Sequence, residues 1–254
     1  MANEVLTEVR GRTLLITLNR PDAMNAVNQA LSEELAQAAD QLDNDSNLSV
    51  GVLTGNGRGF CAGMDLKAFV TGSMPEVEGR GFGGITERSA SKPLIAAIEG
   101  FALAGGLELA MSCDILVAAK GAKLGIPETG VGLFAAGGAL LRLPQALPYG
   151  LAMKMALTAQ PITAEVAHQH GLVTELAEKG EAVNVALELA EQIAKNAPLG
   201  LISSKALIAR SKGQTEAEFW EYQNTEHMHV FSSEDAHEGP TAFAEKRAPV
   251  WRGK

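Results

Sequence analysis

The first 55 residues carry hydrophobic patterns that predict a hairpin, a helix and a buried strand. Residues 5–18 alternate between apolar and polar side chains around Gly11, which is typical of a β-hairpin. Four apolar side chains then recur at the spacing of one helix face: Leu31, Leu35, Ala38 and Leu42. Asn28 stands at the N-cap position of that helix. The apolar run 49–55, which ends at a glycine, predicts a short strand.

A rhythm of strand, glycine turn and helix follows, and it occurs near residues 50–68 and again near 94–112. Residues 93–100 and 114–119 are apolar runs of strand length, and residues 106–113 between them have the composition of a helix. This rhythm predicts an α/β core in which the turns of successive units stack near one another. The glycine-rich stretch 70–91 predicts a mobile or variable wall with no defined element.

From about residue 148 onward the pattern is mostly helical. The expected helices cover 148–158, 163–170, 181–196, 199–212 and 215–231, and the tail adds one more short helix. The residues around Pro198 look like a boundary. We therefore expect residues 1–197 to form the core with the binding site, and residues 198–254 to form a helical C-terminal portion that mediates self-association.

Composition narrows the class of protein. The chain has 254 residues, of which 46% are hydrophobic, and this is enough for one substantial core. Its net charge of −9 argues against general nucleic-acid binding. Cys61 and Cys113 form neither a metal-spacing motif nor a disulfide framework, which favours a reducing cytoplasm. The N-terminal residues lack the apolar stretch of a signal peptide. Three acids interrupt the most apolar span, so no membrane helix is expected there: Glu99, Glu108 and Asp114.

Several common motifs are absent from the sequence. Phe60 replaces the last glycine of a dinucleotide fingerprint, and no phosphate-binding loop, zinc-protease motif or serine-nucleophile motif occurs. The histidines of two pairs are two residues apart within helical patterns, so they point to different faces: His168/His170 and His227/His229. We expect no metal site, and we interpret all five histidines as surface or structural residues.

Two glycine turns have a spacing that suits anion binding. "FCAGMDL" (60–66) and "LAGGLEL" (103–109) each lie between an apolar strand and a predicted helix. A helix N-terminus offers unpaired backbone N–H groups, so two such turns brought together would give two donors for a developing oxyanion. The alternative is that the glycines only make tight turns.

Two acids lie in apolar, glycine-rich surroundings, Glu108 after the second turn and Glu128 in "KLGIPETGVG". Glu108 could be a helix N-terminal acid favoured by the helix dipole, and Glu128 could be a cap or loop acid. If the two carboxyl groups meet, however, their pKa values split, and one stays protonated while the other is ionised. Adding or removing water requires such a pair.

These motifs together resemble the crotonase (enoyl-CoA hydratase/isomerase) superfamily over nearly the whole chain. The matching segments are "LNRPDAMNAV" (18–27), "GRGFCAGMDLK" (57–67), "PLIAAIEGFALAGGLELAMSCDILVAA" (93–119), "LGIPETGVG" (124–132), "RLP" (142–144), "LTAQPITAEVAHQHGLV" (157–173) and "SEDAHEGPTAFAEKRAPVW" (233–251). The resemblance implies an α/β fold, a spiral of repeated β-β-α units with a helical C-terminal subdomain.

The resemblance also implies roles for single residues. The backbone N–H groups of Met64 and Gly105 would form the oxyanion hole for an acyl-CoA thioester. Glu108 and Glu128 occupy the positions of the family's two hydratase glutamates. CoA would lie along two turns and contact seven residues, counting one at the C-terminal helix: Ala23, Met24, Ala62, Asp65, Leu66, Lys67 and Lys246. Lys67 could pair with the nucleotide phosphates or be an ordinary surface lysine, and Lys246 could reach CoA across a subunit boundary.

The chain departs from the family pattern in the acyl pocket. Many family hydratases have Pro-Gly where this chain has Ala135-Ala136, and the glycine is thought to help hold the catalytic water. Ala136 keeps an N–H but adds a methyl group, and Phe134 adds bulk nearby. Specificity for a straight crotonyl chain is therefore in doubt.

The resemblance implies a lyase that hydrates 2-enoyl-CoA thioesters or dehydrates the products. An enoyl-CoA isomerase, a dehydratase for a branched or functionalised hydroxyacyl-CoA, and a non-catalytic acyl-CoA-binding protein remain as alternatives. No cofactor is implied, because CoA is part of the substrate. The expected partners are an acyl-CoA thioester and further copies of the chain, as a homotrimer or a dimer of trimers, with neither nucleic acid nor membrane.

Overall fold

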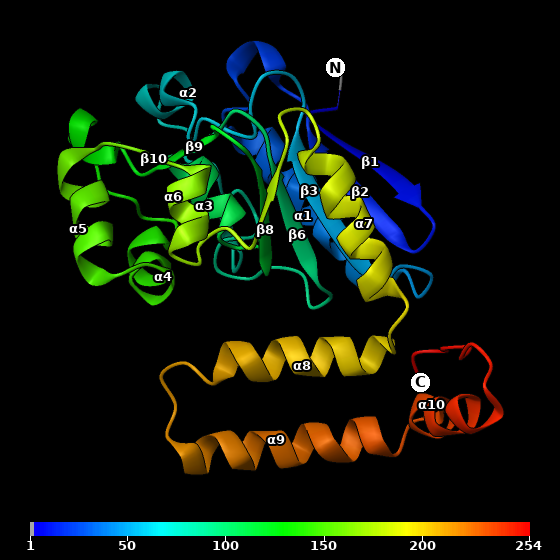
Figure 1. The fold of residues 1–254 in the computed structure, drawn as a ribbon. Coiled ribbons are helices and arrows are strands. Elements are labelled where there is room, and N and C mark those ends of the chain that lie inside the picture. Colours follow the sequence, from blue (N-terminus) through cyan, green and yellow to red (C-terminus); the bar gives the residue numbers. More distant parts are fainter. Residues whose placement is uncertain (1–2) are drawn as a thin grey trace.

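The computed structural model describes residues 3–254, and its strands form one large sheet and two small ones (Figure 1). The strands are β1 Val5–Arg10, β2 Thr13–Leu18, β3 Val50–Gly55, β4 Glu76–Val77, β5 Gly81–Phe82, β6 Leu94–Ile98, β7 Phe101–Leu103, β8 Ile115–Ala119, β9 Lys123–Gly125, β10 Ile162–Thr163 and β11 Glu175–Ala177. The large sheet has the order β1-β2-β3-β6-β8-β11, and only the β1–β2 hairpin is antiparallel within it. The small sheets are β10-β9-β7 and β4-β5.

Helices cover the large sheet and form the C-terminal part. They are α1 Gln29–Asn44, α2 Leu66–Val70, α3 Gly105–Ala110, α4 Ala139–Ala146, α5 Tyr149–Thr158, α6 Ala164–Gln169, α7 Ala182–Ala194, α8 Pro198–Arg210, α9 Glu216–Phe231 and α10 Glu234–Glu245, with short 3₁₀ turns η1 Pro21–Ala23 and η2 Glu128–Val131. None of them is long and apolar enough to cross a membrane within residues 3–254.

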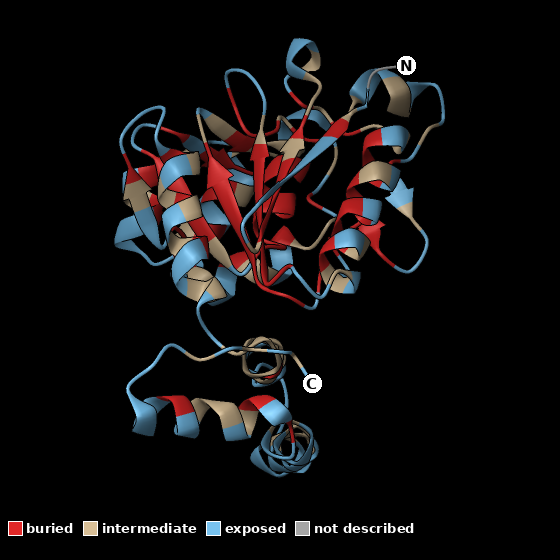
Figure 2. Cartoon of the chain, turned by 90° about the vertical axis from the view of Figure 1, so that its right-hand side faces the viewer, coloured by how far each residue is buried: buried red, intermediate tan, exposed pale blue. Residues whose placement is uncertain are grey.

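Alternation along the strands divides the core between the two faces of the sheet. In β2, Leu14, Ile16 and Leu18 pack with the α1 side, whereas Leu15 packs with the small residues of α7 on the other face. The sheet is therefore buried between helices, as its nearly continuous apolar strands require. Figure 2 shows these buried strands as a central layer.

Successive β-β-α units stack in parallel, and this arrangement confirms the predicted spiral. β6 leads through a glycine turn to β7 and α3, and β8 leads in the same way to β9 and η2. β6 pairs with β8 and β7 pairs with β9, both parallel. Cys61 forms a parallel bridge with Ala102, so the preceding unit joins the same stack. The helix starts of successive units therefore lie beside one another.

The sequence patterns did not predict several short elements that the structure contains. β7 and β9 have three residues each, and this is too short for an alternation to be recognised. α4 follows Gly137-Gly138 and contains Pro144, a composition that reads as a loop. In the stretch 70–91, expected to lack elements, β4 and β5 form a small hairpin.

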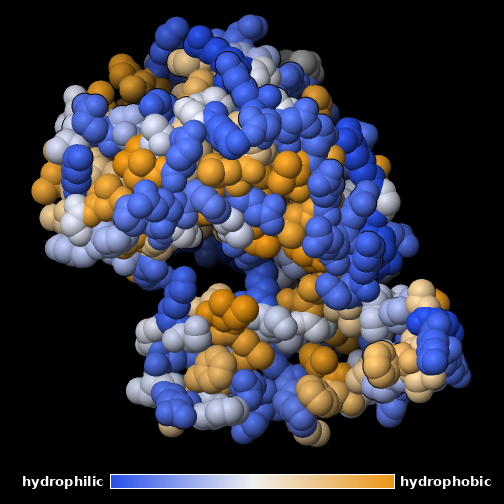
Figure 3. Space-filling model, in the orientation of Figure 1, coloured by the Kyte–Doolittle hydropathy of each residue, from blue (hydrophilic) through white to orange (hydrophobic). Residues whose placement is uncertain are grey.

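The C-terminal helices α8, α9 and α10 lie beside the body rather than within it (Figure 1). α8 begins at Pro198, and apolar side chains are exposed along these helices: Ile208, Trp220, Met228, Phe231 and Phe243. Figure 3 shows apolar surface over α8 and α9. The division at residue 198 and its role in self-association stay predictions.

Candidate active site

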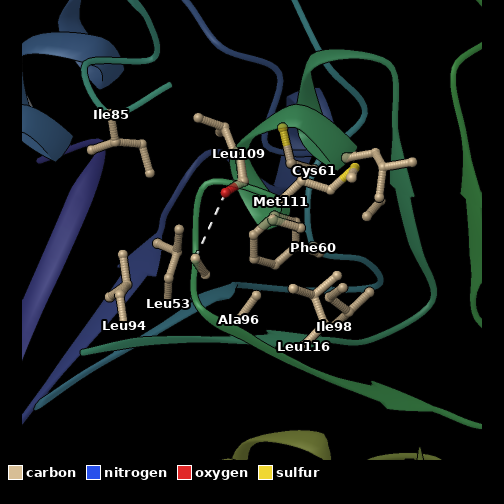
Figure 4. Close-up of a cluster of buried hydrophobic side chains, with 14 of the residues drawn as sticks. Leu53, Phe60, Cys61, Ile85, Leu94, Ala96, Ile98, Leu109, Met111 and Leu116 are labelled. Atoms are coloured by element: carbon tan, nitrogen blue, oxygen red, sulfur yellow. Dashed lines mark hydrogen bonds between the residues drawn. The ribbon is translucent and has the colours of Figure 1, made fainter. Parts of the chain in front are cut away.

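The two glycine turns pack directly against each other. The N–H of Leu103 donates to the carbonyl of Cys61 at 3.0 Å, and a Cβ placed on Gly106 would lie 2.2 Å from that same oxygen. Gly63 has φ of +100°, and a Cβ there would lie 3.0 Å from the nitrogen of Gly105. Only glycine allows this approach. Beneath the turns, Phe60, Cys61, Leu109 and Met111 point into one apolar cluster (Figure 4).

Backbone N–H groups at these turns are available for a ligand. Within residues 3–254, the N–H groups of Met64 and Gly105 donate to no protein acceptor. Ala104, just before Gly105, has φ of +50° and ψ of −132°, a conformation that is rare for a residue with a side chain. The N–H of Ala104 is bonded to the carbonyl of Gly125 in the next unit, which fixes this turn. The fold thus holds two unpaired donors side by side at one cavity.

Glu108 lies one helical turn after Gly105 and is only 3% exposed. Its Oε1 accepts the N–H of Ala139 at 3.1 Å. A Cβ on Gly137 would lie 2.7 Å from its Oε2, so the turn of Gly137 closes over the carboxyl group. Burial raises the pKa of Glu108, while the N–H groups of Ala139 and Gly137 and the charge of Arg142 oppose that rise.

Glu128 is the first residue of η2, and no neighbouring turn donates N–H groups to its carboxyl group. Both of its carboxyl oxygens are buried without a hydrogen-bond partner. Burial raises the pKa of Glu128 to about 7, its own backbone N–H opposes the rise, and the charge of Glu108 adds to it. Glu108 is the more buried of the two, yet it is the one whose ionised form is solvated by donors. The hydrogen bond from Ala139 thus favours the ionised form of Glu108, whereas the carboxyl oxygens of Glu128 have no such donor.

Both acids and both donors line one cavity of about 350 Å³. Eight of the residues expected at the site are found in its wall: Ala62, Met64, Leu66, Gly105, Glu108, Glu128, Phe134 and Ala136. The structure thus brings together positions that are up to 74 residues apart in the chain, Ala62 and Ala136.

Five expected residues lie outside this wall. Ala23 and Met24 belong to the neighbouring turn, where the carbonyl of Met24 accepts the N–H of Ala62 at 3.1 Å. The carboxylate of Asp65 caps α2 and pairs with Arg20, so it serves this loop. Lys67 is exposed on α2. Lys246 is exposed at the end of α10, and this single chain does not bring α10 to α3 (Figure 1).

Asn25 holds the turn of Ala23 and Met24 in place. It is fully buried with φ of +55°, and its Nδ2 donates to the carbonyls of Asn56, Gly59 and Phe60 at 2.9–3.1 Å. The amide thus ties the predicted CoA turn to the first glycine loop.

Sequence reasoning missed much of the cavity wall. The missed lining residues are Phe69, Met74, Glu76, Phe82, Thr86, Glu87, Ala104, Pro127, Val131, Leu133 and Gly137. Five of them come from the stretch 70–91. Its glycines marked a tightly turned segment, but no pattern there indicated which side chains face inward. The five histidines are all exposed, as expected, and residues 3–254 hold no cluster of potential metal ligands.

Comparison with known proteins places this geometry in a family. The profile of the enoyl-CoA hydratase/isomerase family matches residues 8–254. The chain is 40% identical to enoyl-CoA hydratase EchA19 of Mycobacterium tuberculosis, over 99% of this chain and 97% of that protein. It is 36% identical to carnitinyl-CoA dehydratase of Proteus mirabilis over the full length of both. The crystal structure of enoyl-CoA hydratase EchA1 from Mycobacterium marinum is 52% identical, covers both chains fully and superposes with a TM-score of 0.97. The chain belongs to the enoyl-CoA hydratase/isomerase family.

Proposed function

We propose that the protein adds water across the 2,3 double bond of an enoyl-CoA thioester, or removes it in the reverse direction. The observation that carries this proposal is a pair of acids, one supported by a backbone N–H and one without a hydrogen-bond partner, which share one cavity with two unpaired backbone N–H groups. The names of the relatives support hydratase and dehydratase chemistry on CoA thioesters.

The proposed reaction begins with the thioester oxygen between the N–H groups of Met64 and Gly105. Glu108 takes a proton from water as the water oxygen bonds to the β-carbon. The electron pair of the double bond moves toward the thioester oxygen, where the two donors stabilise the enolate-like charge. By analogy with other oxyanion holes, each donor contributes about 3–4 kcal/mol.

Glu128 then gives its proton to the α-carbon, and the enolate electrons form the new C–H bond. Across the step one acid gains a proton and the other loses one, so the pair still holds a single proton. Only the return of that proton to Glu128 is needed before the next turnover. The reverse reaction, dehydration, uses the same groups with their roles exchanged.

The remaining site assignments belong to this proposal. CoA lies along the turns of Ala23–Met24 and Ala62–Lys67, and the acyl chain enters the cavity. The reaction needs no resident cofactor. The exposed apolar side chains of α8–α10 support assembly into trimers, in which Lys246 would face a neighbouring site. The reduced, buried cysteines fit a cytoplasmic protein.

Replacing Glu128 by Gln tests the pair. The amide keeps the shape but cannot give up the proton as an acid, so kcat for hydration of crotonyl-CoA should fall by about 10²–10⁴-fold. Binding of the unreactive butyryl-CoA should be preserved, because Glu128 contributes chemistry rather than thioester binding. Near-normal turnover by E128Q would refute its role.

A dehydratase for a functionalised hydroxyacyl-CoA is the second candidate. Phe134 and Ala136 both line the cavity, and this supports an acyl pocket whose shape differs from that of relatives with the Pro-Gly pattern. Several relatives are carnitinyl-CoA dehydratases. A panel of enoyl-CoA and hydroxyacyl-CoA thioesters of graded length and branching, with products identified by mass, separates the two. Including 3-enoyl thioesters separates both from an isomerase, which shifts the double bond without water uptake.

A further inference from the structure

Arg142 is a half-buried cation that the proposed reaction leaves without a role. It lies in α4, in the "RLP" segment, and does not line the cavity. Its Nη1 donates to the carbonyl of Gly137 at 3.2 Å, and its Nη2 donates to the carbonyl of Thr86 at 2.5 Å. Gly138 has a φ of +103°, and the position that its Cβ would take lies 2.3 Å from Nη1, so the guanidinium packs directly on this glycine.

These two carbonyls belong to two segments that both line the cavity. Gly137 belongs to the turn whose N–H groups hold Glu108, and Thr86 belongs to the segment 74–87, which contributes five lining residues. A planar guanidinium can hold two acceptors in fixed directions at once. Arg142 therefore fixes the 137–139 turn relative to the segment of Thr86, and the N–H of Ala139 in that turn holds the carboxyl group of Glu108.

The charge of Arg142 favours the ionised form of Glu108 and opposes the rise in its pKa that burial causes. The pKa of Glu128 is raised by burial and by the charge of Glu108, and its own backbone N–H opposes that rise. The other ionisable groups around Glu108 do not supply a cation. Glu76, Glu87 and Glu128 are acids, and Cys113, which also faces Arg142, is kept neutral because burial raises the pKa of its thiol.

We propose that Arg142 is a positioning residue: it holds the 137–139 turn against Glu108 and makes Glu108, rather than Glu128, the member of the pair that carries the negative charge. This inference rests on the proposed acid–base function of the pair. Arg142 thereby acts on the reaction through Glu108, although its own side chain touches neither the substrate nor the reacting atoms.

The test compares Arg142→Met, Arg142→Lys and the control Arg12→Met in the full-length protein. Arg12 is also half-buried, and it also makes a side-chain hydrogen bond, to Ser49 at 2.9 Å. It stands in the turn between β1 and β2 and does not line the cavity. The titration of each carboxyl group is followed by infrared difference spectra of its protonated form, assigned with E108Q and E128Q. The pH profile of kcat/KM for crotonyl-CoA hydration is measured in parallel.

In Arg142→Met, the pKa of Glu108 should rise by about one unit, because an adjacent opposite charge is lost. The acid limb of the pH profile should move up with it, and kcat should fall by about tenfold or more, since misplacement of a reacting group is costly. Arg142→Lys should keep the acid limb near its original pH but lose kcat, because one ammonium nitrogen on a shorter side chain cannot occupy the positions of both Nη1 and Nη2, from which the guanidinium meets the two carbonyls. Arg12→Met should match the wild type in both measurements.

An unchanged titration of Glu108 in Arg142→Met overturns the proposal, as does full activity in Arg142→Lys. If the methionine variant fails to fold, the lysine variant still decides. A merely structural role would lower the rate equally at all pH values and leave the titration in place. Failure of the proposed function looks different: the wild type would hydrate no thioester at all, while the infrared titration would still report on Arg142.

Discussion

At the scale of single residues, the site depends on a glycine that no catalytic motif marks. Gly137 has an ordinary backbone conformation, yet a Cβ there would lie 2.7 Å from Oε2 and 3.0 Å from Cδ of Glu108. Gly137→Ala should therefore push the carboxyl group out of position. A displacement of this kind costs about 10²-fold in kcat, with KM little changed, as steady-state hydration of crotonyl-CoA would measure.

Gly150→Ala is the matched control, because a Cβ at Gly150 meets nothing within 4 Å. Gly150 lies in α5, so alanine should leave the rate unchanged and raise stability by about 0.5–1 kcal/mol. If Gly137→Ala turned over at the rate of Gly150→Ala, the carboxyl group of Glu108 would not need this close support.

At the scale of elements, the segment 74–87 makes the acyl cavity acidic. Glu76 and Glu87 line the cavity in addition to Glu108 and Glu128, and neither forms an ion pair within residues 3–254. An enoyl-CoA with a carboxylate at the end of its acyl chain should thus be a poorer substrate than a neutral one of equal length, because like charges repel. Glu87→Gln should narrow that difference in kcat/KM by a few-fold.

Glu78→Gln controls for the loss of charge, since Glu78 lies in the same segment and outside the cavity wall. If Glu87→Gln and Glu78→Gln narrowed the difference in kcat/KM equally, the net charge of the segment, rather than a charge in the cavity wall, would discriminate between the two substrates.

The helices, strands and turns also show how much of the fold and of the site the sequence could predict. The hairpin around Gly11 and the helix capped by Asn28 are confirmed, because each has a local pattern and a local cap; the Oδ1 of Asn28 accepts the N–H of Leu31 at 2.9 Å. The glycine turns also have local signatures. The inward direction of Phe82 and Thr86, by contrast, is set by packing across the cavity, and the hold of Arg142 on Thr86 joins positions 56 residues apart. No pattern within a short window contains that information.

At the scale of the whole molecule, one ion pair joins the C-terminal helices to the body. Lys205 of α8 donates to the carbonyls of Ala90 and Lys92 at 2.7 and 3.0 Å, and it pairs with Asp114 at 2.8 Å. Asp114 also accepts the N–H of Leu94 at the start of β6. Lys205 thus links α8 to the segment that leads into β6 and to the residue that precedes β8.

Lys205→Met should destabilise the protein, because it removes the cation that pairs with Asp114 and the donor of two carbonyls. Breaking a buried pair costs about 3–5 kcal/mol, and partial exposure here reduces the expected loss to about 2 kcal/mol. Chemical denaturation would measure the loss, and hydrogen exchange should show faster exchange in α8 first, since that helix loses its attachment. Lys120→Met removes a fully exposed pair with Glu178 and should have no measurable effect. Equal stability of the two variants would mean that apolar packing alone holds α8, and that the ion pair only sets its register.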